Sequence, residues 1–318
     1  MRQFVWIVSW GFGACVLAGL VLRWWTGDHL FLSRFTAYFM PWLLIGLIPA
    51  LMWAGLTHHW RLVFVVGACV ILIFAAYVPL FLPRPVTPEP GAGEIRVLSF
   101  NTWSKNTHVA RMAQVILQKQ PDILLLQEIE PRIFEKLIEQ LRGLYPEGSI
   151  SFSYDPRLLQ AVVSRYPIES SVSLKKKGQA QKVVLLSPVG PVTVFNVHPL
   201  RRGGWLRRYR KLAALMEEDI LPDAGPVILG GDFNITDQSQ TFKMINRRLH
   251  NAHLEAGYGF GFTYPSLSLR LFGILPVPPL VRIDHIFFND RFVALQAGTL
   301  KDSGGSDHFP VAAVLAPK

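Results

Sequence analysis

The first 82 residues carry almost no charge, and this feature constrains the fold more than any other. Only seven charged side chains precede Glu94. Three uncharged stretches, at residues 4–22, 37–56 and 62–82, are 19, 20 and 21 residues long. A helix of about 20 apolar residues crosses the hydrocarbon core of a bilayer. The sequence therefore predicts a membrane anchor of three transmembrane helices within residues 1–82.

Tryptophans near the ends of these stretches favour the same interpretation. Amphipathic rings collect at the headgroup level of a bilayer, and five tryptophans lie near the stretch ends: Trp24, Trp25, Trp42, Trp53 and Trp60. A cleaved signal peptide is the alternative for the first stretch, but no small-residue cleavage site follows it. Buried helices of a soluble core are the alternative for all three, but none shows a polar face.

The charges between the stretches leave the orientation open. One orientation places Arg2 and Arg61 on the inner side, and the other places Arg23, Arg34 and Arg84 there. Two against three is too small a difference for the positive-inside rule. Three spans put the N-terminus and the rest of the chain on opposite sides of the bilayer. We expect a multi-pass integral protein of a bacterial inner membrane.

Residues 94–318 have the composition of a soluble domain, with 27 Lys and Arg against 20 Asp and Glu. Residues 83–93 contain four prolines and two glycines, which predicts a semi-rigid linker between the anchor and this domain. The only cysteines, Cys15 and Cys69, lie in the anchor. The soluble domain can therefore form neither a disulfide nor a cysteine-based metal site.

Short β-rich stretches alternate with helical ones in the soluble domain. Helices are predicted at residues 108–118, 131–141 and 205–220. Residues 122–126 form a near-continuous apolar run and residues 226–229 are apolar, as strands buried on both faces are. Further strands are predicted at residues 95–100, 161–165, 182–186, 192–197, 281–288, 292–298 and 309–315. This order predicts an α/β fold of packed sheets with helices outside.

Polar residues suited to catalysis occur where these strands end. They are Asn101, Glu128, His198, Asp232, Asn234, Asp307 and His308, with Asp284 inside the strand at 281–288. Each has an ordinary alternative, such as a turn residue, a cap or a surface histidine. Asp284 is harder to explain in this way, because an unpartnered buried carboxylate is costly. The carboxylates and amides together form a thiol-free set that suits Mg²⁺.

Six motifs follow one another along the soluble domain: VLSFNTW, DILLLQE, FNVHP, GGDFN, RIDHIFF and SDHFPV. In this order they resemble the endonuclease/exonuclease/phosphatase superfamily, which includes DNase I-like nucleases, neutral sphingomyelinases and inositol-phosphate phosphatases. The resemblance covers about residues 94–318 and leaves out the three apolar stretches. It implies a four-layer α/β sandwich of the DNase I type, with the active site at one rim.

The resemblance also implies a role for each site residue. Glu128 would hold a divalent cation, Mg²⁺ or Mn²⁺, with Asn101 and Asp307 completing or orienting that site. Asp284 would hold His308 in place, and Asp232 would orient or deprotonate the attacking water. Asn234 and His198 would contact the phosphate oxygens. Either His308 or Asp232 could take the proton of the water. A degenerate, inactive copy is the alternative, although every position keeps the expected residue type.

The substrate class is less constrained than the chemistry. His198 matches the nuclease and sphingomyelinase branches better than abasic-site endonucleases, which tend to have Tyr in this stretch. Six positive charges occur in the eleven residues 201–211, and Arg201, Arg202 and Trp205 are candidate substrate-binding residues. Such a run attracts either a nucleic-acid backbone, with Trp205 available to stack on a base, or anionic lipid headgroups. A solvated helix face is the alternative for its later members.

Two features favour lipid. Residues 261–282 form a long apolar stretch without an acidic residue just before Asp284, which is typical of an interaction loop. A linker at residues 83–93 reaches at most about 35–40 Å, so a tethered active site stays near the bilayer. We therefore expect a membrane-anchored phosphodiesterase acting on phospholipid or lipid-linked phosphoesters. A DNase I-like nuclease and a non-catalytic membrane scaffold are the alternatives.

Overall fold

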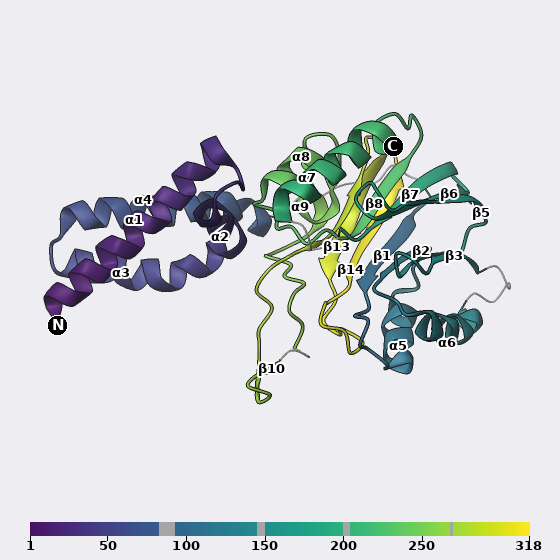
Figure 1. The fold of residues 1–318 in the computed structure, drawn as a ribbon, viewed down its shortest axis with the longest axis horizontal. Coiled ribbons are helices and arrows are strands. Elements are labelled where there is room, and N and C mark those ends of the chain that lie inside the picture. Colours follow the sequence, from purple (N-terminus) through teal and green to yellow (C-terminus); the bar gives the residue numbers. More distant parts are fainter. Residues whose placement is uncertain (83–92, 145–149, 200–203, 268–269) are drawn as a thin grey trace. The chain divides into compact units, whose positions relative to one another are not determined.

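The computed structural model describes residues 1–82, 93–144, 150–199, 204–267 and 270–318 (Figure 1). Residues 83–92 of the predicted linker lie outside the described residues, as do Arg201 and Arg202. The chain divides into two compact units. One contains Met1–Leu82 and Thr236–Lys243, and the other contains Pro83–Ile235 and Met244–Lys318.

The first unit consists mainly of apolar helices: α1 (Arg2–Thr26), α2 (Phe31–Phe39), the 3₁₀ turn η1 (Met40–Leu43), α3 (Leu44–Leu56), α4 (Trp60–Tyr77) and the 3₁₀ turn η2 (Val78–Phe81). The helical runs Arg2–Thr26, Phe31–Leu56 and Trp60–Phe81 are long and apolar enough to cross a membrane. The second run changes to a 3₁₀ turn at Met40–Leu43, where Pro41 lacks the amide hydrogen of an α-helical hydrogen bond.

The helices of this unit bury several small and polar side chains at their contacts, while many of their large apolar side chains are exposed. Gly13 of α1 lies against Val66 of α4, and its carbonyl accepts a hydrogen bond from the Cys69 thiol (3.7 Å). Gly19 lies against Thr36 of α2. Large apolar side chains such as Phe64 are exposed instead. Small residues at helix contacts are typical of packing in lipid, where burying apolar surface between helices gains little.

The second unit contains two mixed six-stranded sheets. The first has the order β13 (Phe292–Thr299), β14 (Val311–Pro317), β1 (Ile95–Asn101), β2 (Ile123–Gln127), β4 (Gln160–Ser164) and β3 (Ser151–Asp155). The second has the order β5 (Ile168–Leu174), β6 (Ala180–Ser187), β7 (Gly190–Val197), β8 (Val227–Asp232), β12 (Asp284–Phe288) and β9 (His250–Asn251). A separate hairpin pairs β10 (Arg270–Leu271) with β11 (Leu275–Pro276).

The two sheets pack on each other, and helices lie outside them (Figure 1). Val97 and Leu125 of the first sheet share one core with Val194 and Ile228 of the second. A second core lies between the first sheet and two helices, α5 (Val109–Lys119) and α6 (Pro131–Leu141). Further helical segments of this domain are η3 (Arg142–Leu144), α7 (Gly204–Leu215), the π-turn η4 (Met216–Ile220) and α9 (Ala252–Ala256), and α8 (Gln240–Asn246) begins in the segment 236–243 that belongs to the first unit. The predicted α/β fold of packed sheets with helices outside is confirmed.

The element bounds show where sequence patterns succeed and fail. Helix α6 has the predicted bounds, and β2 is buried on both faces as its apolar run predicts. The strand predicted at 281–288 begins only at Asp284, so its predicted start was three residues too early and Asp284 is its first residue. Val281 instead forms an isolated bridge with Tyr264. The edge strands β3 and β5 were not predicted, because their polar, partly exposed side chains lack an apolar pattern.

Strand direction brings the predicted site residues to one rim. Strands β1 and β2 run parallel, and so do β7 and β8, so the ends of each pair lie together. Strand β12 runs antiparallel to β8, and β14 runs antiparallel to β1. The chain therefore enters β12 and β14 at the same rim at which it leaves β1, β2, β7 and β8.

Gly231 allows β7 and β8 to approach at this rim. Its φ is +146°, and a Cβ built on it would lie 1.9 Å from the carbonyl oxygen of Val197. Backbone atoms cannot give way as the end of a side chain can. Gly231 thus holds the strand that leads to Asp232 against the strand that leads to His198.

We predict that Gly231→Ala destabilises the second unit by more than about 2 kcal/mol, because the added methyl group meets the backbone of β7. Thermal unfolding of the full-length protein in detergent measures this. Gly298→Ala is the matched control, since its Cβ would meet no described heavy atom within 4 Å. Equal melting temperatures for the two variants would contradict the account of Gly231.

His285 of β12 is a buried histidine held in its neutral form. Its Nε2 donates a hydrogen bond to the carbonyl of Ile235 (2.9 Å). Burial, reinforced by the Arg282 guanidinium, lowers the pKa of His285 from 6.5 to about 3. The unfolded chain therefore binds a proton at this position below about pH 6.5, whereas the folded chain does not.

The stabilisation from neutral His285 is therefore complete above about pH 6.5 and is lost as the pH falls toward 3. We predict that His285→Gln, which keeps a hydrogen-bond donor but does not titrate, loses stability less steeply than the wild type between pH 6.5 and 5. The difference in slope is at most about 1.4 kcal/mol per pH unit. Melting temperatures across this range measure it, and parallel slopes would refute it.

Candidate active site

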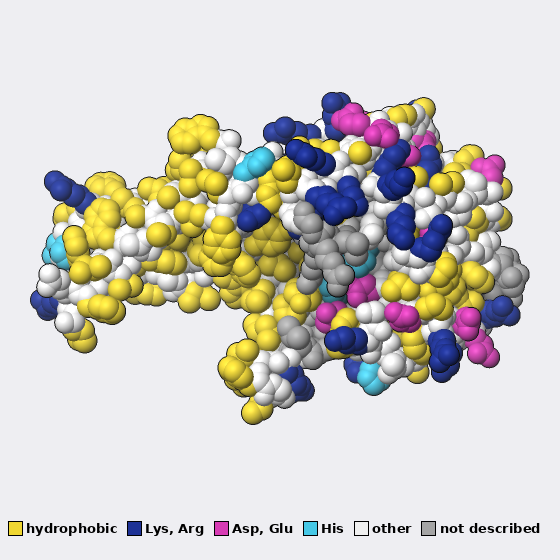
Figure 2. All heavy atoms as spheres, viewed as in Figure 1, with side chains coloured by type: hydrophobic (Ala, Val, Ile, Leu, Met, Phe, Trp, Pro, Cys, Tyr) yellow, Lys and Arg dark blue, Asp and Glu magenta, His cyan; other side chains and the backbone are white. Residues whose placement is uncertain are grey.

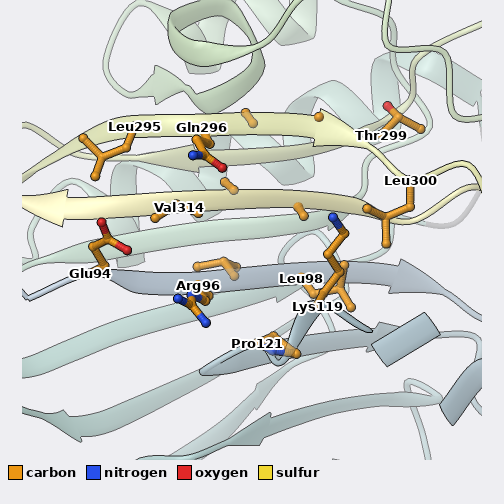
Figure 3. A pocket seen from close by; sticks show the side chains of 15 residues that line it. Glu94, Arg96, Leu98, Lys119, Pro121, Leu295, Gln296, Thr299, Leu300 and Val314 are labelled. Atoms are coloured by element: carbon orange, nitrogen blue, oxygen red, sulfur yellow. The ribbon is translucent and has the colours of Figure 1, made fainter. Parts of the chain in front are cut away.

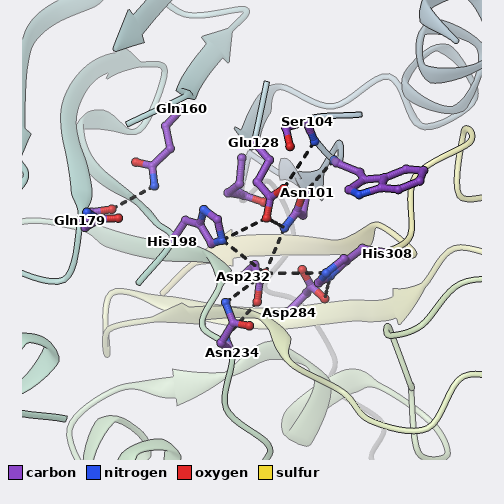
Figure 4. Close-up of polar contacts among 12 residues, drawn as sticks. Asn101, Ser104, Glu128, Gln160, Gln179, His198, Asp232, Asn234, Asp284 and His308 are labelled. Carbon is purple, nitrogen blue, oxygen red and sulfur yellow. Dashed lines mark hydrogen bonds and ion pairs between the residues drawn. The ribbon is translucent and has the colours of Figure 1, made fainter. Parts of the chain in front are cut away.

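Asn101 and Glu128 lie where two parallel strands of the first sheet end (Figure 4). The Asn101 side chain is buried, and its Nδ2 donates to Asp232 Oδ2 (3.0 Å) and to Glu128 Oε1 (3.3 Å). Its Oδ1 accepts a hydrogen bond from the backbone N–H of Trp103 (3.0 Å). Asn101 therefore presents nitrogen to the two carboxylates and orients both of them.

Asp232 ends β8 and is the most enclosed carboxylate of the rim. Its Oδ1 accepts the backbone N–H of Asn234 (2.9 Å), and its Oδ2 accepts the Asn234 side-chain amide (3.3 Å). Burial alone would raise its pKa, but the imidazoles of His308 and His198 outweigh burial, and the pKa of Asp232 is lowered. Asp232 is thus an anion at neutral pH.

Asp284 and His308 form a buried pair across the start of β12. His308 Nδ1 lies 2.9 Å from Asp284 Oδ2, and His308 Nε2 lies 3.8 Å from Asp232 Oδ2 (Figure 4). Burial disfavours the imidazolium, but Asp284 and Asp232 outweigh it and raise the pKa of His308 to about 9. His308 therefore carries a positive charge at neutral pH, with its Nε2–H directed toward Asp232.

His198 follows β7 and contacts two carboxylates. Its Nε2 lies 3.4 Å from Glu128 Oε1 and 3.6 Å from Asp232 Oδ2. Asp307, next to His308, is half-buried, and burial followed by the nearby carboxylate of Glu128 raises its pKa. All the predicted catalytic and metal residues therefore meet at one rim: Asn101, Glu128, His198, Asp232, Asn234, Asp284, Asp307 and His308.

These side chains fit a divalent cation. Glu128, His198 and Asp232 offer ligand atoms within 4.8 Å of one another, and so do Asp232, Asp284 and His308. The Glu128 side chain remains 30% exposed, whereas Asp232 and Asp284 are nearly inaccessible. A cation from solution can therefore reach Glu128 more readily than Asp232 or Asp284. Carboxylates placed close together repel one another, and a bound divalent cation would stabilise their ionised forms.

Left-handed backbone conformations mark this rim. Glu128 and Asn234 both have φ of +54°, and Trp103 has φ of +62°. Non-glycine residues adopt this conformation rarely, and such strain concentrates at functional sites. Each of these residues follows the end of a central strand by one or two positions.

Three functional contacts were not predicted from the sequence. Arg208 of α7 donates through Nη1 to the carbonyl of Asn234 (3.0 Å), so one member of the basic run reaches the site. Gln127 Nε2 donates to Asn196 Oδ1 (2.7 Å), and Asn196 Nδ2 donates to the carbonyl of Leu126 (2.8 Å). This buried bridge joins the two sheets directly behind Glu128 and His198.

The candidate substrate residues of the basic run are placed only in part. Trp205 is half-buried on α7, with its ring centroid 6.0 Å from that of Tyr209. Arg201 and Arg202 lie outside the described residues. Arg208 is therefore the basic residue of this run that the structure brings to the rim.

A separate groove of about 630 Å³ lies over β1, β13 and β14 of the first sheet (Figure 3). Glu94 is the one carboxylate in its described lining, which otherwise includes Arg96, Lys119 and apolar side chains. It lacks the paired acids and histidines of the rim, so its volume does not make it the catalytic centre.

Comparisons with known proteins agree with this geometry. The model of the endonuclease/exonuclease/phosphatase family matches residues 98–308. A search of curated proteins gives no match.

Solved structures share the fold at low sequence identity. An endonuclease/exonuclease/phosphatase from Bacteroides vulgatus has a TM-score of 0.57 and 20% identity, over 71% of this chain and 100% of that one. A family protein from Bacteroides thetaiotaomicron has a TM-score of 0.58 and 19% identity, over 71% and 99%. TDP2 from Caenorhabditis elegans, in truncated form, has a TM-score of 0.54 and 18% identity, over 70% and 98%.

The predicted fold is thus confirmed, and its soluble part is preceded by three long apolar helices. Because the family model spans more than half of the sequence, the chain belongs to the endonuclease/exonuclease/phosphatase family.

Proposed function

We propose that this protein is a membrane-anchored, divalent-metal-dependent phosphodiesterase. One observation carries the proposal: four carboxylates and two histidines from the ends of five different strands converge on one rim, and Figure 4 shows three of these carboxylates with both histidines. A structural role needs no such convergence, because carboxylates placed together repel one another. A cation together with a phosphoester would fill the site with complementary charge.

Glu128 would hold Mg²⁺ or Mn²⁺, with Asp307 as a second carboxylate and Asn101 fixing the orientation of Glu128. The cation would supply Lewis-acid stabilisation of a phosphoryl oxygen. The remaining steps fall to the side chains of the protein. His198, Asn234 and Arg208 have donor groups at the rim and would contact the oxygens of the phosphate, where negative charge grows in the transition state.

Asp232 is our choice for the residue that holds the attacking water and takes its proton. It is anionic at neutral pH, and the backbone of Asn234 fixes one of its oxygens. Against the effect of burial, Asp284 and Asp232 raise the pKa of His308 to about 9, which favours its protonated form at neutral pH and a role as donor over one as base. His308, held by Asp284, would instead donate from Nε2 to the phosphate and stabilise its charge.

A lipid or lipid-linked phosphoester is the substrate class that we favour. The chain carries three helices long and apolar enough to cross a membrane, so its site remains close to a bilayer. Basic residues of α7 would attract an anionic headgroup, and Arg208 links this helix to the rim. The alternative is a nuclease, in which Trp205 and Tyr209 of the same helix would stack on bases.

The first test is hydrolysis by the full-length protein in detergent micelles. We predict Mg²⁺-dependent cleavage of bis(p-nitrophenyl) phosphate and of mixed phospholipids, which EDTA abolishes. His308→Ala should lower the rate more than about 100-fold, because it removes the charge opposite the developing oxyanion. His250→Ala is the matched control. His250 lies on β9 and pairs with Glu255 and Asp290, away from the rim residues.

The same preparation separates the alternatives. Cleavage of plasmid DNA without cleavage of any phospholipid would favour the nuclease. A folded protein that cleaves no substrate with any divalent metal would favour the non-catalytic scaffold.

A further inference from the structure

The hairpin of β10 and β11 exposes a cluster of large apolar side chains. Leu271 pairs with Leu275, and the turn between them presents Phe272 and Ile274. Phe272 is 87% exposed, Ile274 74% and Leu275 61%. A soluble surface seldom exposes neighbouring side chains of this size unless they contact a partner.

The charge around the hairpin is one-sided. Residues 256–283 contain no acidic residue, and their two cations are Arg270 and Arg282. Arg282 is buried, whereas Arg270 lies on the hairpin and donates to the carbonyl of Ile274 (3.0 Å). An apolar tip next to a cation, in a stretch of sequence without an acidic residue, matches the surface of a bilayer, where headgroup phosphates lie above the acyl chains.

The base of the hairpin is built into the active site. The Tyr264 ring lies 4.8 Å from the His308 ring, centroid to centroid. The backbone N–H of Ser266 donates to the carbonyl of Asp307 (2.7 Å). The returning strand joins the same base, because the N–H of Leu280 donates to the carbonyl of Tyr264 (2.8 Å). Whatever holds the tip of the hairpin therefore also positions the rim that carries His308.

Basic and apolar surfaces lie on one face of the second unit. Figure 2 shows Lys and Arg side chains gathered over α7 and hydrophobic side chains over the hairpin, with histidine and acidic side chains visible between them. Arg207 and Arg210 of α7 are exposed. A bilayer surface that contacted both the basic residues of α7 and the apolar hairpin would therefore also face the active site between them.

We propose that the hairpin at Leu271–Leu275 inserts into the surface of a bilayer that contains anionic phospholipid. The site then receives its phosphoester directly from the lipid surface. The second statement rests on the proposed function, whereas the insertion does not. A protein groove is a poorer occupant, because this chain already carries three helices of membrane-spanning length and the exposed basic residues complement anionic headgroups.

The test uses a single fluorescent label on the full-length protein. Cys15 and Cys69 are the only cysteines, so replacing both with alanine gives a background for Phe272→Cys labelled with NBD. Val172→Cys is the matched control, because Val172 is also an exposed apolar residue and lies on the edge strand β5 of the second sheet. Both proteins are reconstituted in phosphatidylcholine–phosphatidylglycerol vesicles with and without doxyl-labelled lipid.

We expect blue-shifted emission at position 272 and quenching by doxyl lipid that is several-fold stronger than at position 172. Emission at 272 that is typical of water would overturn the proposal. A blue shift without quenching would also overturn it, because the tip would then be buried against protein, such as a second copy of the chain.

A double variant separates this proposal from the proposed function. In Phe272→Ser/Ile274→Ser, the ratio of vesicle-lipid hydrolysis to bis(p-nitrophenyl) phosphate hydrolysis should fall several-fold. If the labelled Phe272→Cys protein is quenched by doxyl lipid but the protein without these substitutions hydrolyses no phosphoester, insertion is supported and the phosphodiesterase is refuted. An unchanged ratio with no quenching would refute insertion and leave the phosphodiesterase standing.

Discussion

Repulsion among the carboxylates of the rim is the constraint on which the rest of the site depends. Glu128, Asp232, Asp284 and Asp307 meet where the strands of both sheets end. Three groups oppose this repulsion: the Asn101 amide between two carboxylates, His198 beside the same two, and His308 beside Asp284. The pKa of Asp307 remains raised, because burial and the charge of Glu128 outweigh the effect of His308. A cation between Glu128 and Asp307 would complete the balance.

The two sheets hold this cluster together from behind. The buried bridge from Gln127 to Asn196 spans the sheets one residue before Glu128 and two before His198. Gly231 brings the neighbouring strand close enough to place Asp232 beside His198. The cluster therefore depends on packing between strands far apart in the sequence. Glu128 and Asn234 adopt left-handed backbone conformations one and two residues after the ends of β2 and β8, respectively, which sets the direction of their side chains.

Much of this could be predicted from the sequence, since strand ends carry the chemistry. The apolar runs before Asn101, Glu128 and His198 predict strands that end in polar side chains, and family motifs give their roles. Asp284 needed a partner because it is acidic within an apolar stretch, and that partner is His308. Other features depend on tertiary structure alone. No periodicity shows that the Asn101 amide turns its nitrogen to the carboxylates, that Arg208 reaches Asn234, or that Gln127 meets Asn196.

The central claim is that the rim is a divalent-cation site centred on Glu128. Anomalous diffraction from crystals of the full-length protein grown with Mn²⁺ tests it most directly. The account predicts a manganese peak about 2.1 Å from a carboxylate oxygen of Glu128 and its loss in Glu128→Gln. A peak that persists in that variant, or one that lies away from the rim, would contradict it.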